Sequence, residues 1–101
     1  MRVVFSPMAS DDLLAIAEYI AQDNASRALS FVDELEAKCI GLGLAPGIGT
    51  QCPGLGAGVT MFPFRRYLIF YRQVRQTEGD EALRIERVLH GARLIDDGDF
   101  L

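Results

Sequence analysis

The sequence predicts an α+β domain in the order β-α-α-β-β-β, with an antiparallel helical hairpin packed on a mainly antiparallel four-stranded sheet. Three observations support this prediction: two neighbouring apolar patterns of helical spacing, a loop rich in glycine and proline, and three strand-like runs after it. A chain of 101 residues suits one domain over residues 1–101 and is too short for two independent cores.

The first strand is predicted at Arg2–Phe5 and ends at Ser6-Pro7. Ser6 suits the N-cap of a helix, and Pro7 suits its first position, where the missing N–H removes no hydrogen bond. The apolar residues of this helix recur at helical spacing: Leu13, Ile16, Ala17 and Ile20. Asp11 and Asp12 are expected near the helix N-terminus, where the helix dipole favours negative charge.

The second helix is predicted to follow a polar break at Asp23-Asn24, which offers a new cap. Its apolar positions follow i, i+3, i+4, i+7 spacing over more than three turns: Ala28, Phe31, Val32, Leu35, Cys39 and Leu42. Gly41, Gly43 and Pro46 end this helix. Because only two or three polar residues join the helices, they are expected to lie antiparallel.

The second half of the chain is predicted to form a loop and three strands. Residues 46–58, PGIGTQCPGLGAG, contain two prolines and five glycines and therefore form the loop. Strand-like runs follow at 59–64, 67–74 and 83–90, with turns at 64–66 and 76–80. Pro63 suits an edge strand or a strand end, whereas the aromatic and β-branched run 67–74 is expected to be central.

The formal charge of −4 is unevenly distributed along the chain. Residues 1–58 contain three basic and seven acidic side chains, whereas residues 59–95 contain seven arginines and four acids. The overall acidity disfavours tight non-specific binding to nucleic acid, which depends on neutralising phosphates. Arginines without lysine favour planar, bidentate contacts with carboxylates or phosphates, and the alternative is that they line a solvated sheet face.

No motif supports a cofactor, a metal or a membrane. Cys39 and Cys52 lie thirteen residues apart in a chain with one histidine, which does not make a zinc site, and Cys39 is expected to be a buried thiol. No P-loop or dinucleotide-binding glycine pattern occurs. No apolar run approaches the roughly 20 residues of a membrane span. Residues 1–7 lack the features of a signal peptide, so a cytoplasmic location is expected.

Three blocks of the sequence occur in a characteristic order. FPFRRYLIFYR at 62–72 resembles the F-P-x-x-R-Y-L-I-F-Y-R block of the RelE/ParE toxin superfamily, and RVLHGAR at 87–93 resembles the end of the last strand in ParE-type members. LAIAEYIAQDNASRALSFVDELEAKC at 14–39 resembles the ParE pattern of I-x-x-Y-I followed by A-x-x-F-x-x-x-L. One position departs from the family. Arg65 stands where members often have glycine, so the turn either differs in shape or adds a cation.

The resemblance implies two mechanisms of toxicity. RelE-type members cleave mRNA in the ribosome, whereas ParE-type members are implied to poison DNA gyrase without bond-making chemistry. A metal-free ribonuclease needs a base, an acid and cations on the phosphate. Its candidate groups here are the single histidine, His90, and Arg65, Arg66, Arg87 and Arg93. Because the C-terminal tyrosine or lysine cluster typical of RelE-type nucleases is missing and the chain is acidic, we favour the ParE-like interpretation, with the nuclease as the alternative.

The predicted function is a ParE-like toxin of a type II toxin–antitoxin pair, of the plasmid-stabilisation type. A cognate ParD-like antitoxin is the expected partner, DNA gyrase is the implied target, and DNA is contacted only through the antitoxin. The expected target surface comprises Arg65, Arg66, Arg72, Arg84, Arg87, His90 and Arg93. A third interpretation, left open by the departure at Arg65, is a non-toxic family member that binds an antitoxin.

Several side chains have a structural interpretation beside the functional one. Strict alternation places Arg87 with Leu83, Ile85 and Leu89, so the strand has either a partner-bound cation or a break in its alternation. A lone histidine at a strand end, such as His90, is more often a hydrogen-bonded structural residue than a base.

The central strand 67–74 has two apolar faces, and its aromatic residues favour core packing over a base-stacking platform. The helical hairpin covers one face. An antitoxin segment is expected to cover part of the other face or to fill the groove beside the helices. The acidic tail 96–101 either docks Phe100 and Leu101 on the body or is mobile.

Overall fold

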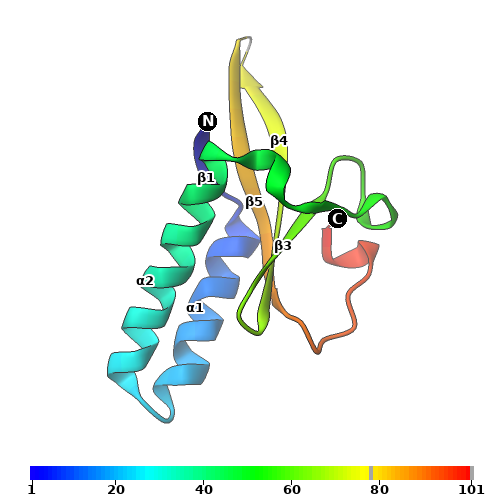
Figure 1. The fold of residues 1–101 in the computed structure, drawn as a ribbon. Helices are drawn as coiled ribbons and strands as arrows, with labels where there is room; N and C mark the ends of the chain where they lie inside the picture. The colour runs from blue at the N-terminus through cyan, green and yellow to red at the C-terminus, as the bar shows by residue number, and fades with distance from the viewer. Residues whose placement is uncertain (78, 101) are drawn as a thin grey trace.

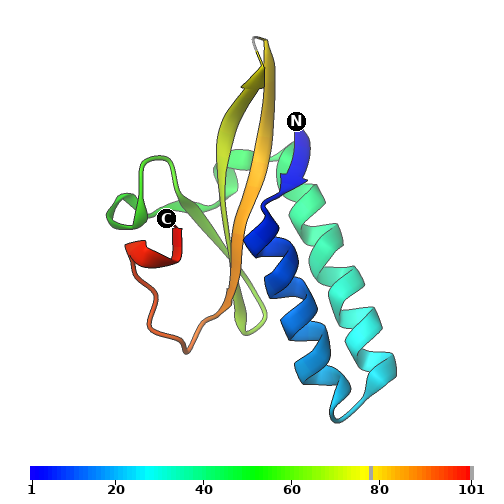
Figure 2. The same ribbon diagram turned by 180° about the vertical axis from the view of Figure 1, so that it is seen from behind.

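The computed structural model describes residues 1–77 and 79–100, which are arranged in three layers (Figure 1). The helical hairpin of α1 (Pro7–Ala21) and α2 (Ala25–Gly41) lies on one side of the sheet. The loop after α2 and the C-terminal segment lie on the other side, as the view from behind also shows (Figure 2). The predicted α+β fold is confirmed. No helix in the described ranges has the length and apolar character needed to cross a membrane.

The sheet has five strands in the spatial order β1-β5-β4-β3-β2. Their bounds are Arg2–Phe5 for β1, Thr50–Gln51 for β2, Thr60–Phe64 for β3, Tyr67–Thr77 for β4 and Asp80–His90 for β5. β1 pairs with β5 in parallel, and the other pairs are antiparallel. The long run 67–74 is therefore central, and Pro63 lies where β3 has no partner on its outer side, as predicted.

Two details of the sheet differ from the prediction. The loop 46–58 contains β2, a strand of only two residues that pairs with Met61 and Thr60 and is too short to produce a periodic pattern. The last two strands are also longer than expected, because β4 runs to Thr77 and β5 begins at Asp80. The turn predicted over 76–80 is correspondingly shorter, and its residue 78 lies outside the described residues.

Both predicted helix caps are confirmed. The side chain of Ser6 accepts a hydrogen bond from the backbone N–H of Ala9 at 3.0 Å, and Asn24 accepts one from Arg27 at 3.0 Å. The expectation for Asp11 and Asp12 is wrong, because neither acid lies in the first turn of α1. Asp12 instead faces the sheet, where it binds β5.

The helix side of the sheet forms the larger core. This helix-side core contains the buried residues Ala9, Leu13, Ile16, Phe31, Leu35, Cys39, Leu42, Ile69, Tyr71, Leu83, Ile85 and Val88. Burial raises the pKa of the Cys39 thiol to about 12, which agrees with its predicted role as a small apolar residue.

The opposite face of the sheet is covered by the chain itself. Its buried residues are Val59, Phe70 and Leu89, and the residues packed against them are Cys52, Leu55, Met61, Leu68, Ile95 and Phe100. We call this group the tail-side cluster. The rings of Phe100 and Phe70 meet edge to face at 5.0 Å between centroids. The expected cover by an antitoxin segment is therefore wrong for this face, and the tail docks through Phe100, whereas Leu101 lies outside the described residues.

A β-bulge in β5 explains the arginine among its apolar residues. Phe70 pairs with Arg87 and the next residue, Tyr71, pairs with Ile85. Glu86 is therefore an extra residue that has no partner in β4. After this point the alternation is shifted, and Val88 joins the helix-side core while Leu89 joins the tail-side cluster. Strict alternation was therefore wrong here, and the alternative of a break is confirmed.

Candidate functional site

The residues predicted as a target surface separate into two groups. Arg65, Arg66 and His90 line a hollow near the closed end of the helical hairpin, where α1 is joined to α2. The other residues, Arg72, Arg84, Arg87 and Arg93, form ion pairs with acids on or near the tail side of the sheet. A single continuous surface that contains all seven is therefore not formed.

Arg87 is buried and connects three parts of the chain. Only 8% of its surface is exposed, and its guanidinium donates hydrogen bonds of 2.8 and 2.9 Å to the two carboxylate oxygens of Asp12. It also donates to the backbone carbonyl of Asp99 at 3.0 Å, and Asp12 accepts a further bond from the N–H of Val88. The hydrogen bonds to Asp12 raise the pKa of Arg87. Arg87 therefore holds α1, β5 and the tail together.

The remaining arginines of this group have acidic partners within the chain. Arg93 pairs with the carboxylate of Asp99, which also accepts from the N–H of Asp96. We call Asp12, Arg87, Arg93 and Asp99 the tail network. Nearby, the carboxylate of Glu86 lies 3.4 Å from the Nε of Arg72 and 3.2 Å from the Nε of Arg84. Their positive charges are therefore largely compensated by buried acids.

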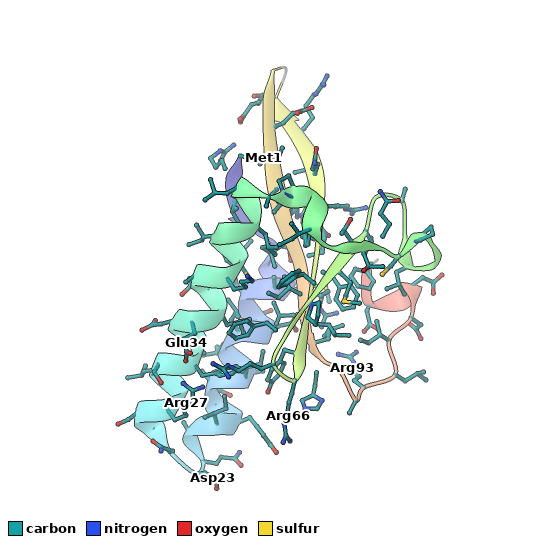
Figure 3. The ribbon with its side chains drawn as sticks, viewed as in Figure 1. Met1, Asp23, Arg27, Glu34, Arg66 and Arg93 are labelled. Carbon is teal, nitrogen blue, oxygen red and sulfur yellow. The ribbon has the colours of Figure 1, made fainter. Side chains whose placement is uncertain are left out.

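The hollow has a volume of about 580 Å³ and is enclosed by four segments: the end of α1, the start of α2, the β3–β4 turn and the end of β5. Its lining residues are Tyr19, Ile20, Arg27, Phe31, Arg65, Arg66, Tyr67 and His90. Figure 3 shows Arg27 and Glu34 on α2 above Arg66, which projects from the tip of the β3–β4 turn. The lining does not include Asp12, Arg87, Arg93 or Asp99, the residues of the tail network.

The floor of the hollow is aromatic. The ring of Phe31 lies 5.7 Å from that of Tyr67, and Tyr67 meets the ring of His90 edge to face at 5.2 Å. Burial, and to a lesser extent the neighbouring Tyr19, raises the pKa of Tyr67. Among the described residues, no hydrogen bond engages the hydroxyl of Tyr67 or that of Tyr19. The floor therefore offers apolar area and free hydroxyl groups.

Three arginines form the rim of the hollow. Arg27 and Arg65 both pair with the carboxylate of Glu34, and the hydrogen bond from Arg27 is the main reason why the pKa of Glu34 is lowered. Arg66 is exposed, and within residues 1–77 and 79–100 no acid pairs with its guanidinium. Arg66 is therefore the rim cation that is most available to a partner.

The backbone of Arg65 explains the departure from the family pattern. Its φ of 54° lies in the left-handed region that favours glycine, and a side chain there costs roughly 1–2 kcal/mol. The turn therefore has a backbone that suits glycine, and the arginine at this position places a cation beside Glu34. The carbonyl of Arg66 accepts a hydrogen bond of 2.8 Å from the N–H of Gly91, which joins this turn to the end of β5.

His90 has the structural hydrogen bond that was expected for it. Its Nδ1 accepts from the backbone N–H of Ala92 at 3.1 Å, so the neutral ring carries its proton on Nε2. The ring is exposed at the edge of the hollow. In the part of the chain that the structure describes, no group of three or more histidine, cysteine, aspartate or glutamate side chains is placed to hold a metal.

Sequence reasoning missed most of the hollow. Tyr19, Ile20, Arg27, Phe31 and Tyr67 come from two helices and a strand, and only the fold brings them together with the rim. One signal was present, because Tyr19 lies outside the apolar stripe of α1 and is 69% exposed. A single exposed aromatic residue is common on protein surfaces, so this signal was weak.

Comparisons with known proteins agree with this fold. The family described as "ParE toxin of type II toxin-antitoxin system, parDE" matches residues 3–95. The structure of the "Chromosomal ParDE TA system from P. aeruginosa" superposes with a TM-score of 0.71 at 20% identity, covering 89% of this chain and 95% of that chain. The "YoeB/ParE toxin from Agrobacterium tumefaciens" gives 0.54 at 17% identity, covering 89% and 98%. At these identities the likeness to solved structures concerns the fold alone. No curated protein sequence matches the chain.

Proposed function

The chain belongs to the ParE toxin family of type II toxin–antitoxin systems, and from this premise we propose that it inhibits DNA gyrase by binding it and is neutralised by a cognate antitoxin. One observation carries the proposal beyond the family. The hollow combines an aromatic floor with an arginine rim, which suits holding a macromolecule. The target surface is then the exposed group Arg65, Arg66 and His90 at the hollow.

The geometry of His90 supports binding over RNA cleavage. A general base must offer an unprotonated nitrogen to the 2′-hydroxyl of its substrate. Here Nδ1 is engaged by the N–H of Ala92, and Nε2 of the neutral ring carries the proton. Arg87, which was a candidate for the phosphate, is buried against Asp12. A ribosome-dependent nuclease would need both groups to be rearranged.

The antitoxin is proposed to dock on the outer side of the helical hairpin. A groove of about 340 Å³ lies there, lined by Phe5, Ser10, Leu13, Leu14, Ala17, Val32 and Glu36. Leu14 is 60% exposed, so burial of this surface by an apolar partner is favourable. An amphipathic helix laid into the groove, or a strand added beside β1 at the sheet edge, provides one.

The experiment that tests the function is induction of the toxin alone, followed by a supercoiling assay with purified gyrase. We expect growth arrest with filamentation and gyrase trapped on cleaved DNA. In-frame cuts in the mRNA of a translating extract would instead support the nuclease. Unaffected growth together with an uninhibited gyrase would support a non-toxic family member.

The antitoxin surface is tested by Leu14→Glu, with Leu29→Glu as its matched control. Both leucines are exposed on the hairpin, but only Leu14 lines the groove. Leu14→Glu is expected to remain toxic in the presence of the antitoxin, whereas Leu29→Glu is neutralised like the parent chain. Equal neutralisation of both variants would place the antitoxin elsewhere.

A further inference from the structure

Resting on the proposed function, we infer that the hollow binds an acidic peptide segment with one large apolar side chain, and that the target protein supplies this segment. The shape, the charge and the free hydrogen-bonding groups of the hollow each support this chemistry. An internal contact of the chain provides a fourth argument.

The floor accounts for the apolar side chain. Ile20, Phe31 and Tyr67 present contiguous apolar surface from both helices and the sheet. The volume of about 580 Å³ falls within the range of sites that hold small ligands, and it accommodates an aromatic or long aliphatic side chain with its neighbours. Such a buried anchor dominates the binding energy of many protein interfaces.

The rim accounts for the acidic residues. Arg27, Arg65 and Arg66 carry three positive charges, and Glu34 carries one negative charge, so the rim has a net charge of 3 − 1 = +2 in a chain of −4. Arg27 and Arg65 are held in place by Glu34, whereas Arg66 has no acid of its own in the described ranges. A guanidinium donates two parallel hydrogen bonds to one carboxylate, so Arg66 suits an aspartate or glutamate.

The tyrosine hydroxyls add donors beside the apolar floor. Tyr67 and Tyr19 both line the hollow, and neither hydroxyl has a hydrogen-bond partner within residues 1–77 and 79–100. A carboxylate bound by Arg66 accepts a further hydrogen bond from such a hydroxyl. The site therefore holds a carboxylate next to an apolar side chain, which is the combination that a short acidic segment supplies.

The chain contains one contact of the same kind. On the tail side, Asp99 binds Arg87 and Arg93, and the adjacent Phe100 packs on Phe70. An acid followed by an aromatic residue therefore already pairs with arginine beside an aromatic ring in this molecule. The hollow likewise presents arginines and aromatic rings side by side, but to a segment from outside the chain.

A nucleic acid fits the hollow less well. Its phosphates need a basic track, because affinity grows with the number of phosphates that are neutralised. The basic rim is short, and Asp23 lies at the adjoining tip of the helical hairpin (Figure 3). The chain as a whole is acidic, so phosphates beyond the rim are repelled. A peptide with two or three acids avoids this repulsion.

The test uses the full chain and a synthetic peptide of sequence acetyl-Gly-Asp-Trp-Glu-Gly-amide. The protein contains no tryptophan, so the anisotropy of the peptide tryptophan reports binding directly. Competitors are the same peptide with alanine for tryptophan, the peptide with asparagine and glutamine for its acids, and hexathymidylate. None of these three is expected to displace the probe at low excess, whereas the acidic peptide with phenylalanine for tryptophan, which keeps the apolar anchor without tryptophan fluorescence, is expected to displace it.

Variants identify the site. Arg66→Ala is expected to lower the affinity for the peptide at least about tenfold, because it removes a charge-assisted hydrogen-bond pair. Tyr67→Phe is expected to weaken it about threefold, because the ring remains and only the hydroxyl is lost. Arg75→Ala is the matched control, since Arg75 is an exposed arginine of β4 outside the hollow, and it is expected to change the affinity less than twofold.

Three outcomes would overturn the inference: equal binding by Arg66→Ala and the parent chain, equal binding of the uncharged peptide, or displacement of the probe by hexathymidylate. A supercoiling assay run on the same proteins separates this inference from the function. Peptide binding with the expected pattern but without gyrase inhibition leaves the hollow valid and removes gyrase as the target. Equal gyrase inhibition by Arg66→Ala and the parent chain removes the hollow from target binding and leaves the function intact.

Discussion

Arg87 and Arg66 belong to the same arginine-rich half of the chain, but the fold uses them in different ways. Arg87 is 8% exposed and donates two hydrogen bonds to Asp12 and one to the backbone of Asp99. Arg66 is exposed at the tip of the β3–β4 turn, and no acid of the described residues pairs with it. One arginine fastens distant segments, and the other remains available to a partner.

The difference depends on where the acidic partners come from. Asp12 lies 75 positions from Arg87 in the sequence, and α1 brings it to the edge of β5 where β1 has already ended. Asp99 is brought by the tail, which packs on the sheet through Phe100. Near the hollow, the single acid of the rim, Glu34, is already shared by Arg27 and Arg65. Charge counted along the sequence therefore overstates the cationic surface.

The largest effect is expected from Arg87→Met. This change leaves the carboxylate of Asp12 half-buried without its cation, which costs about 3–5 kcal/mol of the free energy of unfolding. Urea unfolding followed by circular dichroism measures it. The double variant Asp12→Leu/Arg87→Met should recover much of the loss, because it removes both charges. A loss below about 1 kcal/mol for the single variant would show that the pair is solvated like a surface pair.

A smaller loss of stability is expected from Phe100→Ala. Phe100 is partly buried against Phe70, so its removal is expected to cost about 1–2 kcal/mol of the free energy of unfolding. It should also accelerate trypsin cleavage after Arg93, because the segment 94–100 loses its anchor. Leu94→Ala is the control, since Leu94 is 88% exposed and its truncation should change neither quantity. Unchanged proteolysis of Phe100→Ala would mean that Asp99 alone holds the tail.

Much of the fold was predictable, because its signals are local. Ser6 and Asn24 cap their helices as expected, since a cap depends on a few adjacent residues. The helical periodicity identified Leu35 and Cys39 as core residues. The bulge at Glu86 was not predictable in the same way, because it depends on how β5 pairs with β4. The only sign of the bulge in the sequence was an arginine, Arg87, within an apolar pattern.

The candidate site was predicted less completely than the fold. Of the residues expected at the target surface, the fold brings Arg65, Arg66 and His90 together at one hollow. Residue type could not distinguish Arg87 from these residues, because it does not show whether an arginine pairs with an acid of its own chain or with an acid of a partner. Docking of the tail on the second sheet face was one of two alternatives that the sequence left open, because its contacts, such as that of Phe100 with Phe70, are long-range and depend on the fold.

A modest, pH-dependent effect is expected at Glu34. Arg27 chiefly, and Arg65 in addition, lower its pKa in the folded chain below the ordinary value of 4.5. A lowered folded pKa means that the stabilising contribution is fully present above 4.5 and is lost as the pH falls through the folded pKa. In an NMR titration, the carboxyl midpoint of Glu34 should lie below 4.5 and move towards it in Arg27→Gln. Arg75→Gln should leave the midpoint unchanged, and an identical shift in both variants would indicate a general charge effect rather than the pair.

The smallest effect on stability is expected from Arg66→Ala, and this result would complete the contrast with Arg87. The side chain is exposed and has no ion pair within residues 1–77 and 79–100, so its loss should change the free energy of unfolding by less than about 0.5 kcal/mol. The backbone carbonyl of residue 66 keeps its bond to Gly91 in the variant, so the turn is preserved. Urea unfolding under the conditions used for Arg87→Met gives the direct comparison. A loss as large as that of Arg87→Met would mean that Arg66 also holds the fold together, and any binding defect of the variant would then have a structural cause.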